Sequence, residues 1–299
     1  GGGALALFVG IAVISSRLVR PIAALVGWPV ARAGVAGELA RENTVRNPSR
    51  TAATAAALMI GLALVTLVSV LGAGLIGTAR SDVTDQVTAT HVVTSSNGWE
   101  PVPQGAGRAV AAAQPGALVS SVREDRAVVE GEPVPVSGVD PATIGRAYAF
   151  SWTSGSPDAL DALARGGAVV ARTFAEDHGL AVGSAIRLTT PSGTTFSRVV
   201  AGVYDPPRLM PVLNPVVVSR EKFDAAFPRP KDRYTFVAGA EDGTAGIERA
   251  LAGFPDTRVA TAEAFARATT SDLSTILNML YVLLALSVVV SVFGMVNTL

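Results

Sequence analysis

Side chains with catalytic chemistry are scarce in this sequence of 299 residues. Cysteine is absent, so the chain has no thiolate nucleophile and no disulfide. The two histidines are His91 and His178, and His178 follows two acids in Glu176-Asp177-His178. A metal site needs several convergent ligands, and neither HExxH nor HxxxH spacing occurs here. We therefore interpret this tripeptide as a solvated helix end and predict no metal and no cofactor.

Motifs for phosphate binding and acyl transfer are also missing. The lysines Lys222 and Lys231 follow Glu221 and Pro230, so the Gly-Lys pair of a phosphate-binding loop does not occur. There is no GxSxG nucleophile motif, and two histidines do not support a hydrolase triad. The sequence therefore predicts a protein that is not an enzyme and has no ATPase motif of its own.

One loop has the composition of a contact site. Three prolines stiffen the segment 205–211, DPPRLMP, around Arg208, Leu209 and Met210. A rigid, exposed loop with two apolar side chains could bind another protein or a peptide, or it could simply connect two strands. The sequence leaves both interpretations open.

The elements that position these residues are organised around an uncharged run. Residues 51–79 contain no charged side chain, and this run exceeds the roughly 20 apolar residues of a membrane-spanning helix. Two more uncharged runs lie at the chain ends, in residues 1–16 and 273–299. Buried helices of soluble proteins are usually shorter, so we interpret the central run as a transmembrane helix.

Charge is unevenly distributed along the chain, although the formal net charge is zero. Residues 17–50 carry six Arg and two Glu, whereas residues 80–272 carry 18 basic and 22 acidic side chains. Short, positively charged loops remain on the cytoplasmic side of a membrane. This predicts a multi-pass protein of the cell (plasma) membrane with residues 80–272 extracytoplasmic. Basic residues in that region are scattered and outnumbered, which predicts no nucleic-acid binding.

These patterns divide the chain into a membrane part and an outer α+β domain. In the outer region short strands and helices alternate, with a hairpin turn near Gly131 and a helix capped by Thr261. Both chain ends stop in apolar sequence, so we expect a fragment of a longer membrane protein. The predicted segments are the end of a transmembrane helix (1–20), a cytoplasmic or interfacial amphipathic segment (21–50), a transmembrane helix with stalk (51–79), the extracytoplasmic domain (80–272) and a truncated transmembrane helix (273–299).

The basic segment before the central run is a candidate for coupling to cytoplasmic motion. Residues 34–46 have the pattern of a short amphipathic helix lying along the membrane. Asn47-Pro48 predicts a bend from this helix into the span. Arg41 and Arg46 could instead act only as determinants of topology. The candidate coupling residues are Arg41, Arg46, Asn47, Pro48 and Arg50.

Small side chains recur at every fourth position of the central run. Positions four apart share a helix face, and small residues there allow another helix to approach closely. An alanine-rich composition can also produce such a ladder by chance. The candidate helix-packing residues are Ala53, Ala57, Gly61, Ser69, Ala73 and Gly77.

Two stretches resemble a known family. LARENTVRNPSRTAATAAALMIGLALV is similar to the inner amphipathic segment and first span of FtsX/MacB-like ABC transporter permeases. GGAVVARTFAEDHGLAVGSAIRL, followed by FSRVVAGVYD, resembles the MacB periplasmic core domain of that family, although Ser184 stands where the family commonly has aspartate. The resemblance covers essentially the whole chain. It is greatest to actinobacterial-type permeases with two such units, in which case this chain spans the end of the first unit and the start of the second.

The resemblance implies a permease subunit without catalytic residues, embedded in the lipid bilayer and driven by a dimeric cytoplasmic ABC ATPase. Movement of the outer domain would then serve export, extrusion, or the handling of lipoproteins or lipids, with an extracytoplasmic protein or peptide as a further partner. An alternative within the family is mechanical control of cell-wall hydrolases. A membrane-anchored sensor domain and a membrane-bound enzyme are alternatives outside it.

The charge asymmetry predicts the topology of the chain. Reporter fusions at Arg41 should be active on the cytoplasmic side, and fusions at Gly155 on the external side, because residues 17–50 are basic and residues 80–272 are acidic. Alkaline phosphatase and fluorescent protein fusions at both positions measure on which side of the membrane each position lies. The opposite labelling would overturn both the orientation and the resemblance.

Overall fold

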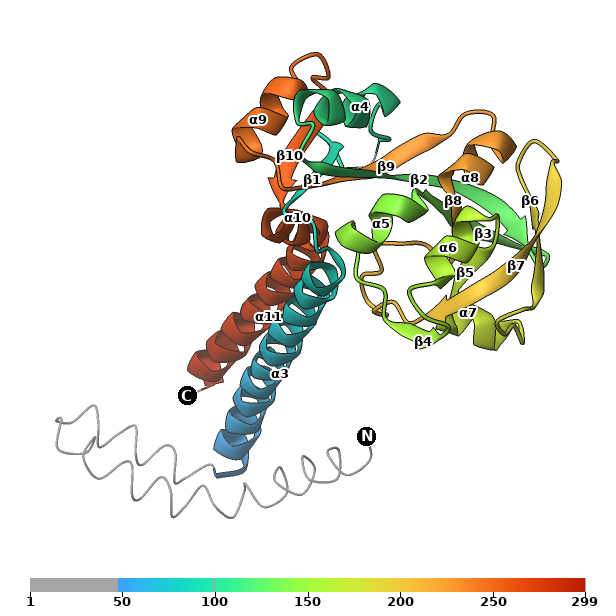
Figure 1. Cartoon of the computed structure of the whole chain (residues 1–299). Helices are drawn as coiled ribbons and strands as arrows, with labels where there is room; N and C mark the ends of the chain where they lie inside the picture. Colours follow the sequence, from blue (N-terminus) through green and yellow to red (C-terminus); the bar gives the residue numbers. More distant parts are fainter. Residues whose placement is uncertain (1–47, 99, 299) are drawn as a thin grey trace. The chain divides into compact units, whose positions relative to one another are not determined.

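The computed structural model of the chain describes residues 48–98 and 100–298 (Figure 1). The chain divides into a first unit, Gly1–Leu75 with Asp272–Leu299, and an outer unit, Ile76–Ser271. The described residues of the first unit belong to helix α3 (Pro48–Gln86) and helix α11 (Ser271–Thr298). Helix α3 continues without a break beyond the uncharged run 51–79 to Gln86, in the outer unit.

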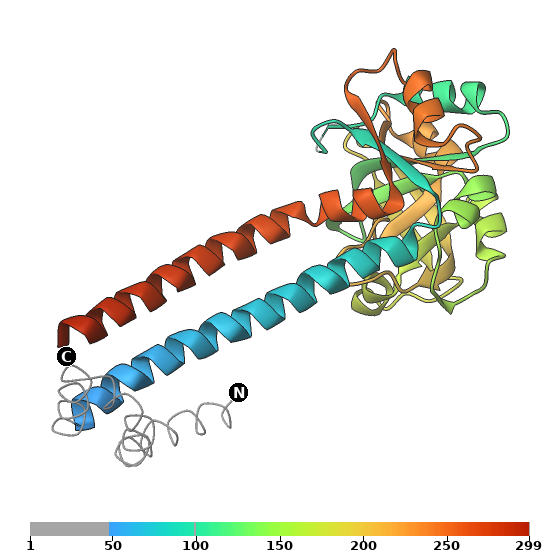
Figure 2. The same ribbon diagram turned by 90° about the vertical axis from the view of Figure 1, so that its left-hand side faces the viewer.

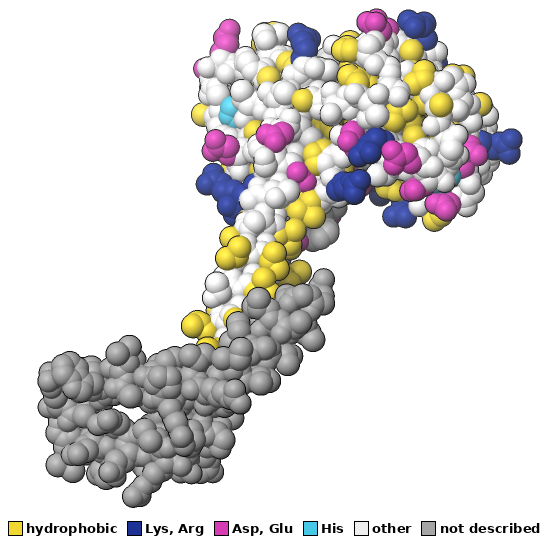
Figure 3. Space-filling model, turned by 90° about the horizontal axis from the view of Figure 1, so that it is seen from below, with side chains coloured by type: hydrophobic (Ala, Val, Ile, Leu, Met, Phe, Trp, Pro, Cys, Tyr) yellow, Lys and Arg dark blue, Asp and Glu magenta, His cyan; other side chains and the backbone are white. Residues whose placement is uncertain are grey.

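Helices α3 and α11 lie side by side in both views (Figures 1 and 2). Their segments Leu58–Gln86 and Ser271–Val290 are long and apolar enough to cross a membrane, and only 6% of the most apolar window of each is buried. Large side chains such as Leu62 and Phe293 are 61% and 70% exposed. Space-filling representation shows hydrophobic side chains along the described part of the helices, whereas acidic and basic side chains are interspersed over the outer unit (Figure 3). A soluble core helix would bury these side chains, so the exposed apolar surface fits contact with lipid.

The outer unit is built on one mixed sheet of ten strands. The strand order is β10-β1-β9-β2-β3-β8-β5-β7-β4, and β6 pairs with both β2 and β7. The strands are β1 (His91–Ser95), β2 (Leu118–Val129), β3 (Glu132–Val139), β4 (Trp152–Ser154), β5 (Ala168–Ala171), β6 (Ala185–Thr189), β7 (Thr195–Tyr204), β8 (Val216–Ser219), β9 (Lys231–Ala238) and β10 (Thr257–Thr261).

Seven helices of the outer unit pack around this sheet. Helices α4 and α9 lie together over strands β1 and β9, and α5 and α10 lie on the opposite face (Figure 1). The helices are α4 (Gln104–Ala113), α5 (Pro141–Ala147), α6 (Ala159–Ala164), α7 (Arg172–Asp177), α8 (Arg220–Ala226), α9 (Gly243–Ala250) and α10 (Ala262–Thr269). Alternation of short strands and helices along the chain therefore produces the predicted α+β arrangement.

Strand β2 is shared by two parts of the sheet. Its first half pairs with β9, its second half pairs with β3, and its end pairs with β6. Because β6 also pairs with β7, the strands β2, β3, β8, β5, β7 and β6 form a closed ring. Ring closure removes free strand edges, which would otherwise expose unpaired backbone groups.

The predicted hairpin near Gly131 is confirmed. It connects β2 to β3 through Glu130 and Gly131, whose φ angles are 48° and 92°. A two-residue loop with positive φ at both positions is the geometry of a type I′ turn, whose twist matches that of the flanking strands. The turn therefore sets the register in which β2 pairs with β3.

Two apolar cores stabilise the outer unit. The larger one contains the buried aromatic side chains Tyr148, Tyr204, Phe223 and Phe236. Packing is close enough that a Cβ on Gly138 of β3 would lie 2.6 Å from the ring of Phe223. The smaller core lies between the helices α4 and α9 and the strands β1 and β9.

A buried ion cluster lies where β2 passes from β9 to β3. Arg123, 3% exposed, occupies a β-bulge and pairs across strands with both Gly138 and Asp232. Its Nη1 donates to Oδ1 of Asp232 at 2.6 Å, and its Nε and Nη2 donate to the two carboxylate oxygens of Asp224 in α8 at 3.0 and 3.2 Å. Burial raises the pKa of Asp232, and the charge of Arg123 opposes that rise. The guanidinium therefore counteracts the effect of burial on the carboxylate of Asp232.

Replacing Arg123 by Met should destabilise the outer unit by about 3–5 kcal/mol, because Asp232 would remain buried without its counter-charge. The folded pKa of Asp232 would then lie further above its ordinary value of 3.8. Asp232 would then bind a proton more tightly in the folded state than in the unfolded state. The variant should therefore lose stability as pH rises from the unfolded pKa of Asp232 through its higher folded pKa. Urea unfolding of the whole chain in detergent, followed by circular dichroism at several pH values, measures both effects.

The matched control is the double variant Arg123→Met with Asp232→Leu. It removes both charges and should recover most of the lost stability, because no unpaired ion remains in the core. A double variant as unstable as Arg123→Met alone would contradict this account.

Candidate functional site

Both histidines make structural contacts in the outer unit. The ring nitrogens of His91 lie 2.9 Å from the hydroxyls of Thr90 and Thr244. His178 follows α7, where its Nδ1 lies 3.0 Å from the carbonyl oxygen of Phe174, and its ring packs against the ring of that residue. In the part of the chain that the structure describes, no group of three or more acidic or histidine side chains could hold a metal ion.

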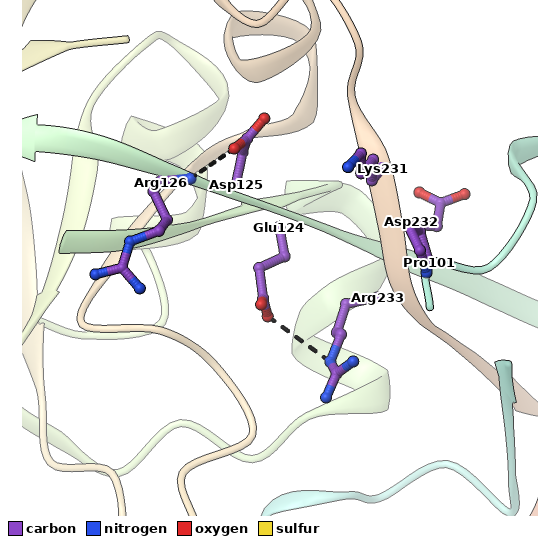
Figure 4. A pocket seen from close by; sticks show the side chains of 7 residues that line it. All are labelled: Pro101, Glu124, Asp125, Arg126, Lys231, Asp232 and Arg233. Atoms are coloured by element: carbon purple, nitrogen blue, oxygen red, sulfur yellow. Dashed lines mark hydrogen bonds and ion pairs between the residues drawn. The ribbon is translucent and has the colours of Figure 1, made fainter. Parts of the chain in front are cut away.

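Charged side chains of β2 and β9 line a shallow hollow of about 260 Å³ (Figure 4). Glu124 lies directly opposite Lys231 across the two strands, and its carboxylate is 4.0 Å from Nε of Arg233. The backbone N–H of Arg126 donates to the carboxylate of Asp125 at 2.8 Å. Opposite charges face one another here, which stabilises the pairing of the strands. Acidic and basic side chains are therefore interspersed in the lining of this hollow.

The contact face of α3 against α11 includes one residue of the predicted small-residue stripe. A Cβ on Gly61 would lie 3.3 Å from Cγ2 of Val288. The other close approach is at Gly72, where a Cβ would lie 2.7 Å from the hydroxyl of Tyr281 and 3.1 Å from Leu277. Gly61 and Gly72 are about three helical turns apart and therefore share one face of α3.

From Ser69 onward, the predicted stripe rotates away from the face that Gly61 and Gly72 share. A spacing of four residues exceeds the 3.6 residues of a helical turn, so each step rotates the stripe by about 40°. Ser69 is half-buried, Ala73 is exposed, and a Cβ on Gly77 would meet nothing within 4 Å. Packing of another helix against Ser69, Ala73 and Gly77 stays a prediction.

Most of the predicted coupling residues lie outside the described residues. This holds for Arg41, Arg46 and Asn47. Helix α3 begins at Pro48, a residue favoured in the first turn of a helix, and it contains Arg50, Ala53 and Ala57, whose side chains are not described. Their roles in coupling and packing stay predictions.

The outer ends of the two long helices approach each other inside the outer unit. Thr261 caps α10 as predicted, because its hydroxyl accepts a hydrogen bond from the N–H of Ala264 at 3.2 Å. Buried Thr270, at the end of α10, donates to the carbonyl of Ala266 and lies 3.5 Å from Nε of Arg80 in α3. The chain therefore enters and leaves the outer unit at neighbouring points.

The proline-rich loop 205–215 connects β7 to β8 and lines two hollows. One, of about 510 Å³, is lined by residues that include Asp85, Phe150 and Arg172. The other, of about 290 Å³, is mainly apolar and is lined by residues that include Ala171 and Leu213. Residues 206–208 line both hollows. The prolines of this loop are visible in the sequence, but the two hollows are completed by distant segments and left no signal in it.

A family model described as the MacB-like periplasmic core domain matches residues 51–251. The chain belongs to this family. The resemblance to FtsX/MacB-like ABC transporter permeases is thereby confirmed, and with it the fold class, a membrane protein with a MacB-like α+β extracytoplasmic domain. Its general role is that of an ABC-type transporter permease. The arrangement with two units in one chain stays a prediction.

Solved structures similar to this MacB-like chain have low sequence identity. The extracellular domain of the noncanonic ABC-type transporter YknZ from Gram-positive bacteria is 9% identical, with a TM-score of 0.42, over 57% of this chain and 99% of that chain. The periplasmic region of MacB from Actinobacillus actinomycetemcomitans is 10% identical, with a TM-score of 0.43, over 62% and 94%. No curated protein sequence matches the chain significantly.

The contact between α3 and α11 can be tested by crosslinking, since the sequence contains no cysteine of its own. The pair Gly61→Cys and Val288→Cys should form a disulfide in membranes. Adding Gly72→Leu should reduce crosslinking about ten-fold, because overpacking at a tight contact typically costs 1–3 kcal/mol.

Gly74→Leu is the matched control, because a Cβ at Gly74 of the same helix would meet nothing within 4 Å. It should leave the yield of the 61–288 crosslink unchanged. Equal yields in the Gly72→Leu and Gly74→Leu backgrounds would show that Gly72 does not set the approach of the helices.

Proposed function

We propose that this chain is the permease part of an ABC transporter in which a separate, dimeric cytoplasmic ATPase moves the extracytoplasmic domain. The observation that carries the proposal is the continuity of α3 from Pro48 to Gln86. At 1.5 Å per residue, a helix of 39 residues is about 58 Å long, compared with about 30 Å for the hydrocarbon core of a bilayer. One rigid element therefore has the length to cross the membrane and to continue into the outer unit.

The two junctions of the outer unit support this proposal. Helix α3 enters it directly, and α10 is followed at once by α11, so both connections to the membrane are helical. Unlike a flexible linker, a helix transmits displacement along its axis. Movement of the helices on the membrane side would therefore move the outer domain. This mechanism needs no conduit for substrate through the helices.

The coupling segment is proposed to be the basic stretch before α3. Arg41, Arg46, Asn47, Pro48 and Arg50 precede or begin the helix, at the membrane face that the charge asymmetry predicts to be cytoplasmic. This position would let them contact the ATPase. Arg41 and Arg46 acting only as topology determinants is the competing role.

The cargo is proposed to be an exported or extruded compound, or a lipoprotein or lipid. Regulation of a cell-wall hydrolase is a second proposal, favoured by the proline-rich loop. This loop exposes Arg208 and 40% of Leu209 beside two hollows, as a surface for an extracytoplasmic protein or peptide would. Both activities would use the same movement of the outer domain.

The test is ATP hydrolysis by the purified chain and by its complex. The chain alone should not turn over ATP, since it has no Gly-Lys phosphate-binding loop, whereas a complex isolated through an affinity tag on the chain should hydrolyse ATP through a second subunit. Phosphate release in lipid nanodiscs measures both. Turnover by the chain alone that survives removal of contaminating ATPases would refute the proposal.

Arg41→Glu separates the two roles of the basic segment. If Arg41 transmits motion, the variant should keep its topology but lose stimulation of the ATPase by the permease. If Arg41 only sets topology, hydrolysis by correctly oriented protein should be unchanged. Fusion reporters at Gly155 provide the topology control.

A further inference from the structure

The last residue of α3 is bound to the proline-rich loop by its side chain. Gln86, 3% exposed, donates from Nε2 to the carbonyl of Met210 at 2.8 Å, and its Oε1 accepts from the N–H of Val212 at 3.0 Å. The hydroxyl of Tyr148 also donates to Oε1, at 3.0 Å, and Nε2 donates to the carbonyl of Asp82 in the preceding turn. A carboxamide has two donor hydrogens and two acceptor lone pairs, so all four are used here.

The C-terminal end of the loop is held by the strand ring instead. Asn214 accepts a hydrogen bond from the hydroxyl of Tyr204 at 2.9 Å through its carbonyl, and its N–H donates to the hydroxyl of Ser137 at 3.1 Å. The carbonyl of Pro215 accepts from the N–H of Ala171 at 2.7 Å. The loop therefore runs between two supports, the strand ring at residues 214 and 215 and the end of α3 at residues 210 and 212.

This arrangement links α3 to the shape of the two hollows. Residues 206–208 line both, and Pro206, Pro207 and Pro211 restrict the backbone dihedrals that could absorb a displacement of Met210. A shift of the end of α3 relative to the ring would therefore move residues 206–208 and change the shape of both hollows. Burial raises the pKa of Tyr148, so its hydroxyl stays protonated and continues to donate.

We propose that Gln86 is a positioning residue that fastens the loop 205–215 to α3, so that movement of α3 is converted into a change of the two hollows. The proposal rests on the proposed function for the source of that movement. The competing explanation is that Gln86 only satisfies buried polar groups at a helix end, as most buried side chains do. That role would affect stability but not the response of the loop to ATP.

The experiment uses two spin labels in the whole chain, reconstituted in nanodiscs with its ATPase. Because the sequence has no cysteine, Thr78→Cys on the exposed side of α3 and Arg208→Cys on the loop give one unique pair. Electron–electron double resonance then measures the distance distribution before and after trapping with ATP and vanadate. In the native background we expect one narrow distribution that shifts on trapping.

Gln86→Met should broaden the resting distribution and abolish the shift, because neither loop contact can form. Gln86→Glu should give an intermediate loss, since a carboxylate accepts from Val212 and Tyr148 but cannot donate to Met210. Tyr148→Phe is the matched control, because it removes a bond to Gln86 without touching either loop contact, and it should keep the native shift.

The outcomes distinguish failure of the positioning role of Gln86 from failure of the proposed function. If the distance distribution of Gln86→Met shifts on trapping as in the native background, the positioning role is overturned, even if this variant has a lower unfolding midpoint. If the distance distribution does not shift in the native background, the result counts against the proposed function. The resting distributions of Gln86→Met and Tyr148→Phe still decide in that case whether Gln86 holds the loop. Identical, narrow resting distributions for these two variants overturn the inference.

Discussion

The need to keep the buried charge of Arg123 paired is the main electrostatic constraint on the outer unit. A guanidinium removed from water is tolerated only when its donors are satisfied by opposite charge, and here two carboxylates from β9 and α8 supply that charge. The cluster lies at the bulge where β2 changes partners. The cluster therefore joins β2, β9 and α8 at the point where β2 passes from the three-stranded part, β10-β1-β9, into the six-stranded ring.

The two long helices follow a different constraint. In their most apolar windows only 6% of the residues are buried, so burial against the rest of the chain does not stabilise these windows, and in a bilayer every backbone polar group must be satisfied within the helix. Their association depends instead on close packing at a few small residues, of which Gly61 and Gly72 have neighbours on α11. The outer unit is held by a dense core and ion pairs, whereas the helices can shift relative to each other at lower cost.

This difference in stabilisation is suited to transmission of movement. A rigid domain responds to a displaced helix only where the helix is attached, and the attachments are specific: Gln86 at the end of α3, and Thr270 beside Arg80. The sequence predicted no side chains for ligand chemistry. Among the described residues, some charged groups face an opposite charge across neighbouring strands, as Glu124 and Lys231 do.

The sequence by itself determined the features that depend on neighbouring residues. The uncharged run 51–79, the turn at Glu130-Gly131, the cap at Thr261 and the α+β alternation were readable because charge, backbone preference and capping act over a few positions. Only the tertiary structure decided that β6 closes the ring on β2, that Arg123 binds Asp232, and that Gln86 binds the loop at Met210. The reason is physical: these partners are separated by more than fifty residues, and a contact made only after the chain has folded imposes no periodicity or spacing on the sequence between them.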